Sequence, residues 1–258
     1  MYAFEFEKPS TVAEAVAALN SGEAQILAGG QTLIPTMKQR LADPGKLVSL
    51  SGIAELSGIS EEGGVVTIGA GTTHTEVAAA GLGALSALAS DIGDPAVRNR
   101  GTIGGSLANN DPSADYPAGI LALGATIVTN SREIPADDFF DGMFTTTLEE
   151  GEIITAVKFS LPEAACYQKF EQPASRFALV GVFVAKTANG VCVAATGASE
   201  EGVHHWPAAE KALNANFSAS ALDDLSVSPD GMISDLHGTA EYRANLVKVL
   251  AKRAVAGC

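Results

Sequence analysis

Hydrophobic and polar residues alternate with a helical period in some stretches of the chain and with a strand period in others. In the first fifty residues, apolar positions recur every three or four residues in two segments, and short apolar runs flank these segments. The predicted elements are, in order, a strand at 4–6, a helix at 12–19, a strand at 25–28, a helix at 32–41 and a strand at 46–50. This order predicts a small β-α-β-α-β unit.

A second unit is predicted between residues 53 and 162. Two strands flank Gly63-Gly64, and Thr73 with Glu76 forms a capping sequence at the start of a helix. A helix rich in Ala and Leu follows at about 83–90. After it come a glycine-rich loop, a loop rich in Asn and Asp, an apolar helix, a strand and a last strand near 153–159.

The remaining residues, 163–258, have a different pattern that favours an antiparallel sheet with helices. Strands are predicted at 167–170, 177–186 and 191–196, and helices at 207–213 and 239–254. Asn189-Gly190 is a strong signal for a two-residue hairpin turn. His204 and His205 fall on an expected loop, as a surface pair without a metal. The pattern therefore predicts an α+β fold with a domain boundary near residue 162.

The charge and the apolar content narrow the range of functions. The formal net charge is −14, which repels nucleic acid and anionic membrane surfaces. The longest apolar runs, at 118–128 and 177–185, are shorter than the roughly 20 residues that span a bilayer. The first residues, "MYAFEFEKP", contain acids where a signal peptide has basic residues. We expect no nucleic-acid partner, no transmembrane segment and a cytoplasmic location.

Cysteine and histidine are too sparse to suggest a metal centre. Cys166, Cys192 and Cys258 are far apart and form no Cys-x-x-Cys pair, so we predict neither an iron–sulfur cluster nor a zinc site. No nucleophile elbow and no His-Glu-x-x-His helix is present. We therefore assign no catalytic residue and expect a bound cofactor to supply any reactive group.

Two glycine-rich loops are candidates for binding an anionic cofactor. Gly29-Gly30-Gln31-Thr32 follows a predicted strand and opens a helix, and the loop from Thr102 to Ser106 offers the same chemistry again, with hydroxyls at both ends. Free backbone N–H groups at such places bind phosphate, so two loops could hold a diphosphate without a basic patch. Each loop alone is also compatible with a plain tight turn. Gly69-x-Gly71 lacks the third glycine of a dinucleotide fingerprint and is interpreted as an ordinary turn.

Four ordered motifs carry a resemblance to a known family. They are "AGGQTLIPTMKQR" from residue 28, "GDPAVRNRGTIGGSLANNDPSADYPA" from 93, "FTTTLEEGEIITAVKF" from 144 and "SDLHGTAEYRANLVKVLAKRA" from 234. In these motifs, and along essentially its whole length, the sequence resembles the FAD-binding medium subunit of the molybdenum hydroxylases. This is the family of xanthine dehydrogenase and carbon monoxide dehydrogenase, and within it the sequence resembles the medium subunits of carbon monoxide dehydrogenase-like enzymes in particular. The resemblance implies a PCMH-type FAD-binding fold of two small α/β subdomains, about 1–52 and 53–162, before a C-terminal antiparallel domain.

The resemblance also implies a set of FAD-binding residues. They are Ala28, Gly29, Gly30, Gln31, Thr32 and Leu33 in the first loop, Thr102, Gly104, Gly105 and Ser106 in the second, and Asp115, Leu161 and Lys169 beyond them. By resemblance, the two loops bracket the diphosphate, Asp115 binds ribityl or ribose hydroxyls, Leu161 packs on the isoalloxazine ring, and Lys169 lies near the flavin.

Each of the last three residues also has a simpler interpretation, and the two loops depart from the family pattern. Taken alone, Asp115 would be a helix N-cap, Leu161 a packing residue and Lys169 an exposed strand lysine. Gln31-Thr32 stands where many relatives have His-Ser, and Ser106 where they have Asn. Amide and hydroxyl groups still donate hydrogen bonds at these positions.

The resemblance implies an electron-transfer role within a larger complex. A large subunit with a molybdenum–pterin centre would oxidise the substrate, and a small subunit with two [2Fe-2S] clusters would pass electrons to the FAD of this chain. A quinone, NAD or another acceptor would receive them. The assembly would be a dimer of heterotrimers in the cytoplasm, with contact to the inner face of the membrane through the complex. Two alternatives stay open, a stand-alone FAD-dependent oxidase or dehydrogenase and a scaffold subunit without cofactor.

Overall fold

The computed structural model describes residues 1–258 and contains three separate sheets. The first is a parallel sheet with the strand order β1-β3-β2. Its elements are β1 (Glu5–Glu7), α1 (Val12–Leu19), β2 (Ala24–Leu27), α2 (Leu33–Lys38) and β3 (Lys46–Ser49). The predicted β-α-β-α-β unit is therefore confirmed, and each strand is within two residues of its expected bounds.

The start of α1 shows how the local sequence sets an element. The Thr11 hydroxyl accepts a hydrogen bond from the Glu14 N–H at 3.2 Å, as a capping residue should. The Glu14 carboxylate instead accepts from the N–H and the hydroxyl of Ser10, both at 2.8 Å. Ala15 and Ala18 then face the small core of this unit. The capping residue and the apolar spacing together account for the helix.

The second sheet has five strands in the order β4-β5-β8-β6-β7. The strands are β4 (Ile59–Glu62), β5 (Val65–Gly69), β6 (Thr126–Thr129), β7 (Glu133–Pro135) and β8 (Ile154–Ser160). The helical segments of this region are η1 (Ala54–Leu56), α3 (His74–Ala79), α4 (Ala84–Ser90), α5 (Pro95–Arg98), α6 (Ile103–Asn109), α7 (Tyr116–Ala122) and α8 (Ala136–Phe139). Every strand pair is antiparallel. The capping box of Thr73 and Glu76 is present as expected, whereas β7, α5, α6 and α8 have no counterpart among the expected elements. The helix α6 occupies most of the stretch expected to be a glycine-rich loop.

The third sheet is antiparallel, with the order β12-β11-β10-β9. Its elements are β9 (Ala164–Glu171), β10 (Ala178–Thr187), β11 (Gly190–Ser199), β12 (Gly202–His205), α9 (Pro207–Ala215), η2 (Ala219–Leu222) and α10 (Ala240–Gly257). The predicted hairpin is confirmed, but its two-residue turn is Ala188-Asn189, one residue earlier than expected, and Gly190, with a φ of 119°, is the first residue of β11. The expectation that His204 and His205 lie on a loop is wrong, because both belong to β12 and are half-buried.

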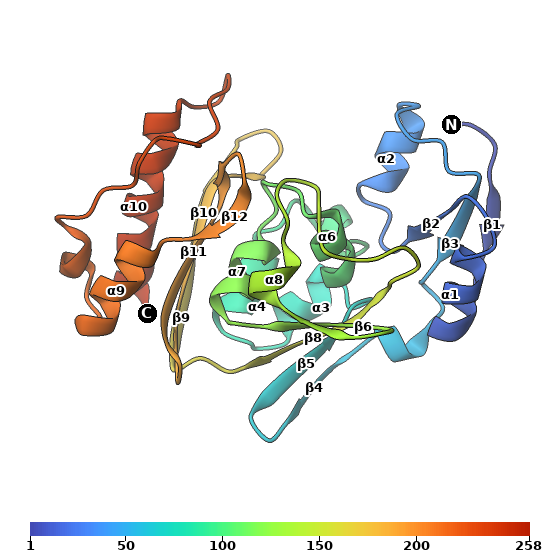
Figure 1. Ribbon diagram of the computed structural model, residues 1–258, viewed down its shortest axis with the longest axis horizontal. Coiled ribbons are helices and arrows are strands. Elements are labelled where there is room, and N and C mark those ends of the chain that lie inside the picture. Colours follow the sequence, from blue (N-terminus) through green and yellow to red (C-terminus); the bar gives the residue numbers. More distant parts are fainter.

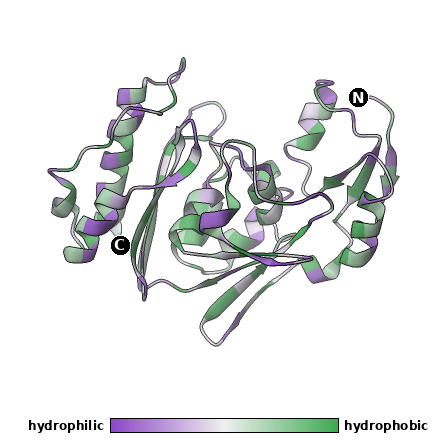
Figure 2. Ribbon diagram, in the orientation of Figure 1, coloured by the Kyte–Doolittle hydropathy of each residue, from purple (hydrophilic) through white to green (hydrophobic).

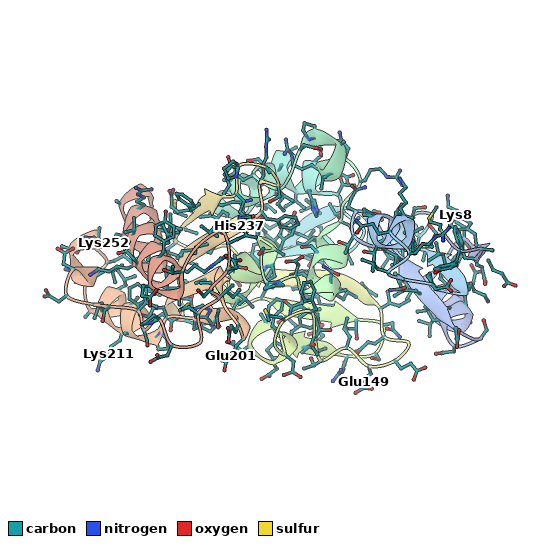
Figure 3. All side chains as sticks on the ribbon, turned by 90° about the horizontal axis from the view of Figure 1, so that it is seen from above. Lys8, Glu149, Glu201, Lys211, His237 and Lys252 are labelled. Atoms are coloured by element: carbon teal, nitrogen blue, oxygen red, sulfur yellow. The ribbon has the colours of Figure 1, made fainter.

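Layers of helix and sheet alternate along the long axis of the molecule (Figure 1). The helices α4 and α7 pack on one face of the C-terminal sheet, and α9 and α10 cover its other face. The parallel sheet lies at the opposite end, and the labelled Lys8 and Lys252 of Figure 3 mark the two ends. No helix is both long and apolar enough to cross a membrane.

Strand β10 is apolar at nearly every position because both faces of its sheet are covered. Phe183 and Ala185 join the core formed with the central helices, while Val182 and Val184 pack against α9 and α10. In Figure 2 the strands of the two larger sheets are mainly coloured as hydrophobic. The chain passes from one sheet to the next between Ser160 and the start of β9. The domain boundary near 162 stays a prediction, since one hydrophobic core includes residues from both sides of it.

A buried ion pair joins the central helices to the C-terminal sheet. The Lys169 ammonium on β9 lies 2.9 Å from an Asp115 carboxylate oxygen at the start of α7, and both side chains are about 5% exposed or less. The Tyr167 hydroxyl donates a second hydrogen bond to Asp115 at 2.6 Å. Lys169 also donates to the Asp91 carbonyl at 3.0 Å. Lys169 therefore differs from the exposed strand lysine that its local sequence indicates.

A histidine joins the same two parts at a second place. One ring nitrogen of His205 lies 2.9 Å from an Asp137 carboxylate oxygen on α8, and the other lies 2.7 Å from Glu210 on α9. Protonation makes both nitrogens donors, so the charged ring bonds to both acids at once. These hydrogen bonds, Glu210 first and Asp137 after it, raise the pKa of His205 in spite of its partial burial.

Replacement of Lys169 by Met should destabilise the protein by about 3–5 kcal/mol, because it leaves the buried Asp115 carboxylate without its counter-ion. Denaturant unfolding measures this change. The control is Lys186→Met, which removes a surface pair with Glu163 and should cost about 1 kcal/mol or less. The double variant Lys169→Met, Asp115→Asn should recover much of the loss. An equal, small effect of both lysine substitutions would contradict a structural role for the buried pair.

His205 should make the stability of the folded chain depend on pH. Because its pKa is raised in the folded state, its contribution is complete below the unfolded-state value of about 6.5 and is lost as the pH rises through the raised value. The difference in melting temperature between the native chain and His205→Gln should therefore shrink from mildly acidic to mildly alkaline pH. A difference that stays constant or grows with pH would show that the bridge is not ionic. His237→Gln, at an exposed position, serves as the control.

Candidate cofactor-binding site

A cleft of about 700 Å³ contains most of the residues that the sequence singled out. Such a volume is typical of a site for a small organic molecule or cofactor. The expected residues that line this cleft are Ala28, Gly29, Gly30, Gln31, Thr32, Leu33, Thr102, Gly105, Ser106 and Asp115. The two glycine-rich loops, about seventy residues apart in the sequence, thus line the same cleft.

The first glycine loop has an unusual run of free hydrogen-bond donors. None of the six backbone N–H groups from Ala28 to Leu33 donates a hydrogen bond within the protein. Gly30 has a φ of 72°, a conformation that side chains disfavour and that turns the chain from β2 into α2. The Gln31 side-chain amide donates to the Gly29 carbonyl at 3.3 Å. Gln31 and Thr32 are exposed, but the other four residues are half-buried, where N–H groups normally find partners, so this run is suited to an external acceptor such as a phosphate.

The second glycine loop differs from the expectation of free N–H groups. The Gly104 N–H donates to the Ala70 carbonyl at 2.9 Å, and the Ser106 N–H donates to the Thr102 carbonyl at 3.0 Å. The Thr102 hydroxyl caps α6 by accepting from the Gly105 N–H at 3.1 Å. The expectation is therefore wrong for these three groups, since capping and strand contacts use them. The Ser106 hydroxyl and the Thr102 N–H are left without partners.

Direct contact between the two loops depends on glycine. A Cβ atom added to Gly29 would lie 2.1 Å from the Arg100 carbonyl oxygen, a distance that no side chain tolerates. A Cβ on Gly105 would lie 3.4 Å from the Cβ of Ala28. Gly104 has another reason to be glycine, because its Cβ would lie 2.5 Å from that of Ala70. Gly29 thus permits the approach of the loops, and Gly104 permits the packing of α6.

A second cavity of about 290 Å³ lies behind the contact between the loops. It shares wall residues with the cleft, among them Ala28, Gly29 and Gly105. Gly104 lines this cavity, and so do the apolar residues Ile26, Leu50, Leu148, Ile153 and Ile154. We did not expect these apolar residues in the site. The sequence does not mark them as site residues, because strand residues such as Ile153 and Ile154 are apolar in any core.

Asp115 closes the other end of the cleft, and its surroundings exclude the simple cap interpretation. It occupies the N-cap position of α7, but its side chain makes no capping bond. The carboxylate binds Lys169 and Tyr167 instead. Burial raises the pKa of Asp115, and the charge of Lys169 and the Tyr167 hydroxyl oppose this rise. Asp115 lines the cleft with its carboxylate already bonded, while Lys169 lines neither cavity.

Leu161 lines neither cavity, so its contact with the cofactor stays a prediction, whereas the turn between β9 and β10 lines the cleft. Leu161 follows β8, is 45% exposed and lines neither cavity. Ser175, Arg176 and Phe177 of the turn do line the cleft, and Phe177 is 46% exposed. Sequence reasoning missed these residues, because the turn is distant from both glycine loops along the chain.

The charges around the cleft agree with binding through neutral donors. Asp111 and Glu152 line it in addition to Asp115, and Arg176 is its basic residue. Glu152 is bonded to the Arg132 guanidinium, with its two oxygens each 2.9 Å from a nitrogen. No group of three or more His, Cys, Asp or Glu side chains is placed to hold a metal. An anion in this cleft would be bound mainly by backbone N–H groups.

Comparisons with known proteins show the family to which the chain belongs. Residues 2–163 match the family model described as the FAD binding domain in molybdopterin dehydrogenase. The carbon monoxide dehydrogenase medium chain of Hydrogenophaga pseudoflava is 34% identical over 98% of this chain and 96% of its own length. The nicotine 6-hydroxylase medium subunit of Paenarthrobacter nicotinovorans is 33% identical over 98% and 96%.

A solved structure gives the same result for the fold. Reconstituted carbon monoxide dehydrogenase from Oligotropha carboxidovorans superposes with a TM-score of 0.90 and 32% identity, over 99% of this chain and 97% of that one. The likeness confirms the α+β class expected from the sequence. Because the family model covers more than half of the chain and the relatives align over nearly their whole length, this chain belongs to the family of FAD-binding domains in molybdopterin dehydrogenases, and its cofactor is FAD.

Proposed function

We propose that this chain is the electron-transfer flavoprotein subunit of a molybdenum hydroxylase complex. It would take electrons from [2Fe-2S] clusters of a small subunit and pass them to a quinone, NAD or another acceptor. The observation that carries the proposal is the run of six free N–H groups that faces a cleft large enough for FAD. The similarity to medium subunits over almost the full length supports it.

The cavities suggest how the chain holds each part of FAD. The first loop would bind the diphosphate through its backbone N–H groups, with help from the Ser106 hydroxyl. The apolar cavity behind the loops would take the adenine ring, which prefers apolar walls. The flavin half would then lie toward Asp115 and Phe177. On this arrangement Leu161 and Lys169 act indirectly, Leu161 at the surface and Lys169 by fixing Asp115.

The chain contributes binding and orientation, and the chemistry belongs to the cofactor. Bound FAD accepts and releases electrons singly or in pairs. No side chain in the cleft is assigned as a general base or nucleophile. We therefore place substrate oxidation on a large molybdenum–pterin subunit, within a dimer of heterotrimers in the cytoplasm. The two relatives are named for carbon monoxide and for nicotine, and their identities to this chain are nearly equal. We therefore propose that the large subunit determines the substrate. Within the family, we propose a complex of the carbon monoxide dehydrogenase type.

Native purification of the complex tests this function. We expect three kinds of subunit, an absorption spectrum with flavin and iron–sulfur bands, and release of FAD on denaturation. Addition of carbon monoxide without oxygen should bleach both bands. FAD in a chain that turns over an organic substrate without partners would instead establish a stand-alone oxidase. An assembled complex without flavin would establish a scaffold.

Ser106→Ala should weaken FAD binding without loss of stability. The Ser106 hydroxyl has no protein partner, so its removal costs no internal hydrogen bond. Loss of one bond to the cofactor is worth about 0.5–1.5 kcal/mol, which is a roughly 2- to 12-fold rise in the dissociation constant. Fluorescence titration of the flavin-free complex with FAD measures it. Ser90→Ala, at an exposed helix end, is the control, and equal affinities of both variants would place the Ser106 hydroxyl outside the cofactor contacts.

A further inference from the structure

His74 is a buried polar side chain in the cleft wall that makes no hydrogen bond through its ring. It is 5% exposed and lines the 700 Å³ cleft. Its Nδ1 atom is fully enclosed without a partner, so the ring nitrogen that a molecule in the cleft can reach is Nε2, which also has no partner. Leaving a buried donor or acceptor unpaired costs about 1–3 kcal/mol, so a well-packed protein rarely keeps one without a reason.

The backbone fixes the position of this ring closely. His74 is the first residue of α3, and its N–H donates to the Gly101 carbonyl at 3.0 Å. A Cβ atom on Gly101 would lie 2.5 Å from the Nε2 atom of His74, so glycine at 101 keeps space for the ring. Gly101 also lines the cleft. The imidazole thus lies directly beneath the loop that leads into Thr102.

A second unpaired polar group lies beside His74. The ring of Tyr116 is 5.3 Å from the His74 ring between centroids, and its buried hydroxyl has no partner. Tyr116 directly follows Asp115, which lines the same cleft. Two unpaired polar groups therefore lie together behind the cleft wall.

The charge state of His74 suits it to a neutral partner. Burial lowers its pKa to about 4, and the charge of Arg98 adds to this effect. The ring is therefore neutral near pH 7, with one N–H donor and one acceptor nitrogen. Such a ring matches the uncharged hydroxyl, carbonyl and ring-nitrogen groups of a flavin and its ribityl chain.

We propose that His74 is a positioning residue that hydrogen-bonds the flavin half of the bound cofactor. This inference rests on the FAD-binding function proposed above and adds a contact outside the two glycine loops. Asp115 is already bonded to Lys169 and Tyr167, so its remaining acceptor capacity is limited. His74 lines the same cleft, and its Nε2 atom donates or accepts one hydrogen bond there, depending on the tautomer.

Affinity measurements on variants of the flavin-free complex test the proposal. We expect His74→Leu to weaken FAD binding by about three- to tenfold, as one lost hydrogen bond predicts. His74→Gln, which keeps a donor and an acceptor, should recover most of the affinity. ADP, which has the diphosphate but no flavin, should bind all variants equally. The control is His237→Gln, at the exposed histidine labelled in Figure 3 on the loop before α10.

A spectroscopic measurement keeps the test independent of how well the variants fold. In the native complex grown with ring-¹⁵N histidine, the infrared difference between oxidised and reduced flavin should contain isotope-sensitive imidazole bands, and His74→Gln should remove them. Unchanged FAD affinity of His74→Leu, an equal loss of ADP affinity, or the absence of these bands would overturn the assignment. Failure of the native complex to bind FAD would instead overturn the proposed function.

Discussion

The close approach of Gly29 to the Arg100 carbonyl is the contact on which the site depends. Gly29 lies in the loop after β2 of the parallel unit, and Arg100 lies in the loop after α5 of the five-stranded unit, so this contact sets how closely the two units approach. Gly29 lines both the cleft and the smaller cavity. Any side chain at 29 would separate the two loops. A single missing Cβ atom therefore shapes the whole binding region.

The cleft is also connected to the C-terminal sheet. Asp115 lines the cleft and is bonded to Lys169 and Tyr167 on β9, and the turn after β9 supplies Phe177 to the cleft wall. A change in the position of β9 would therefore move both the carboxylate and the aromatic ring. The C-terminal part thus supports the site from outside the two glycine loops.

Local signals in the sequence predicted much of the fold. The capping box of Thr73 and Glu76 and the hairpin signal at Asn189-Gly190 act within four residues, so their outcome follows from the local chain. Strand β12 was missed because His204 and His205 have no strand pattern and are held by pairing with β11. Antiparallel pairing in the second unit likewise depends on contacts that no local pattern reports.

The hydrogen-bonding state of the site could be predicted where the local chain geometry determines it. It could not be predicted where residues distant in the sequence supply hydrogen-bond partners. The first loop keeps its N–H groups free because it lies between a strand and a helix, as its sequence indicates. In the second loop the Thr102 cap and the Ala70 carbonyl use the N–H groups, and Ala70 lies 34 residues before Gly104 in the chain. The burial of Lys169 depends on Asp115, 54 residues earlier. Contacts between residues so far apart along the chain cannot be inferred from a single sequence.

Binding through neutral backbone donors has a consequence for how the subunit works among other anions. A site built from lysine and arginine loses affinity as salt screens its charges, and it attracts any polyanion nearby. The donors from Ala28 to Leu33 are fixed dipoles within a chain of net charge −14, so their hold on a ligand depends on close fit and little on ionic strength. A net charge of −14 repels other polyanions such as nucleic acid at long range. On the proposed binding mode, a diphosphate would be held only where it fits against the N–H groups of the first loop.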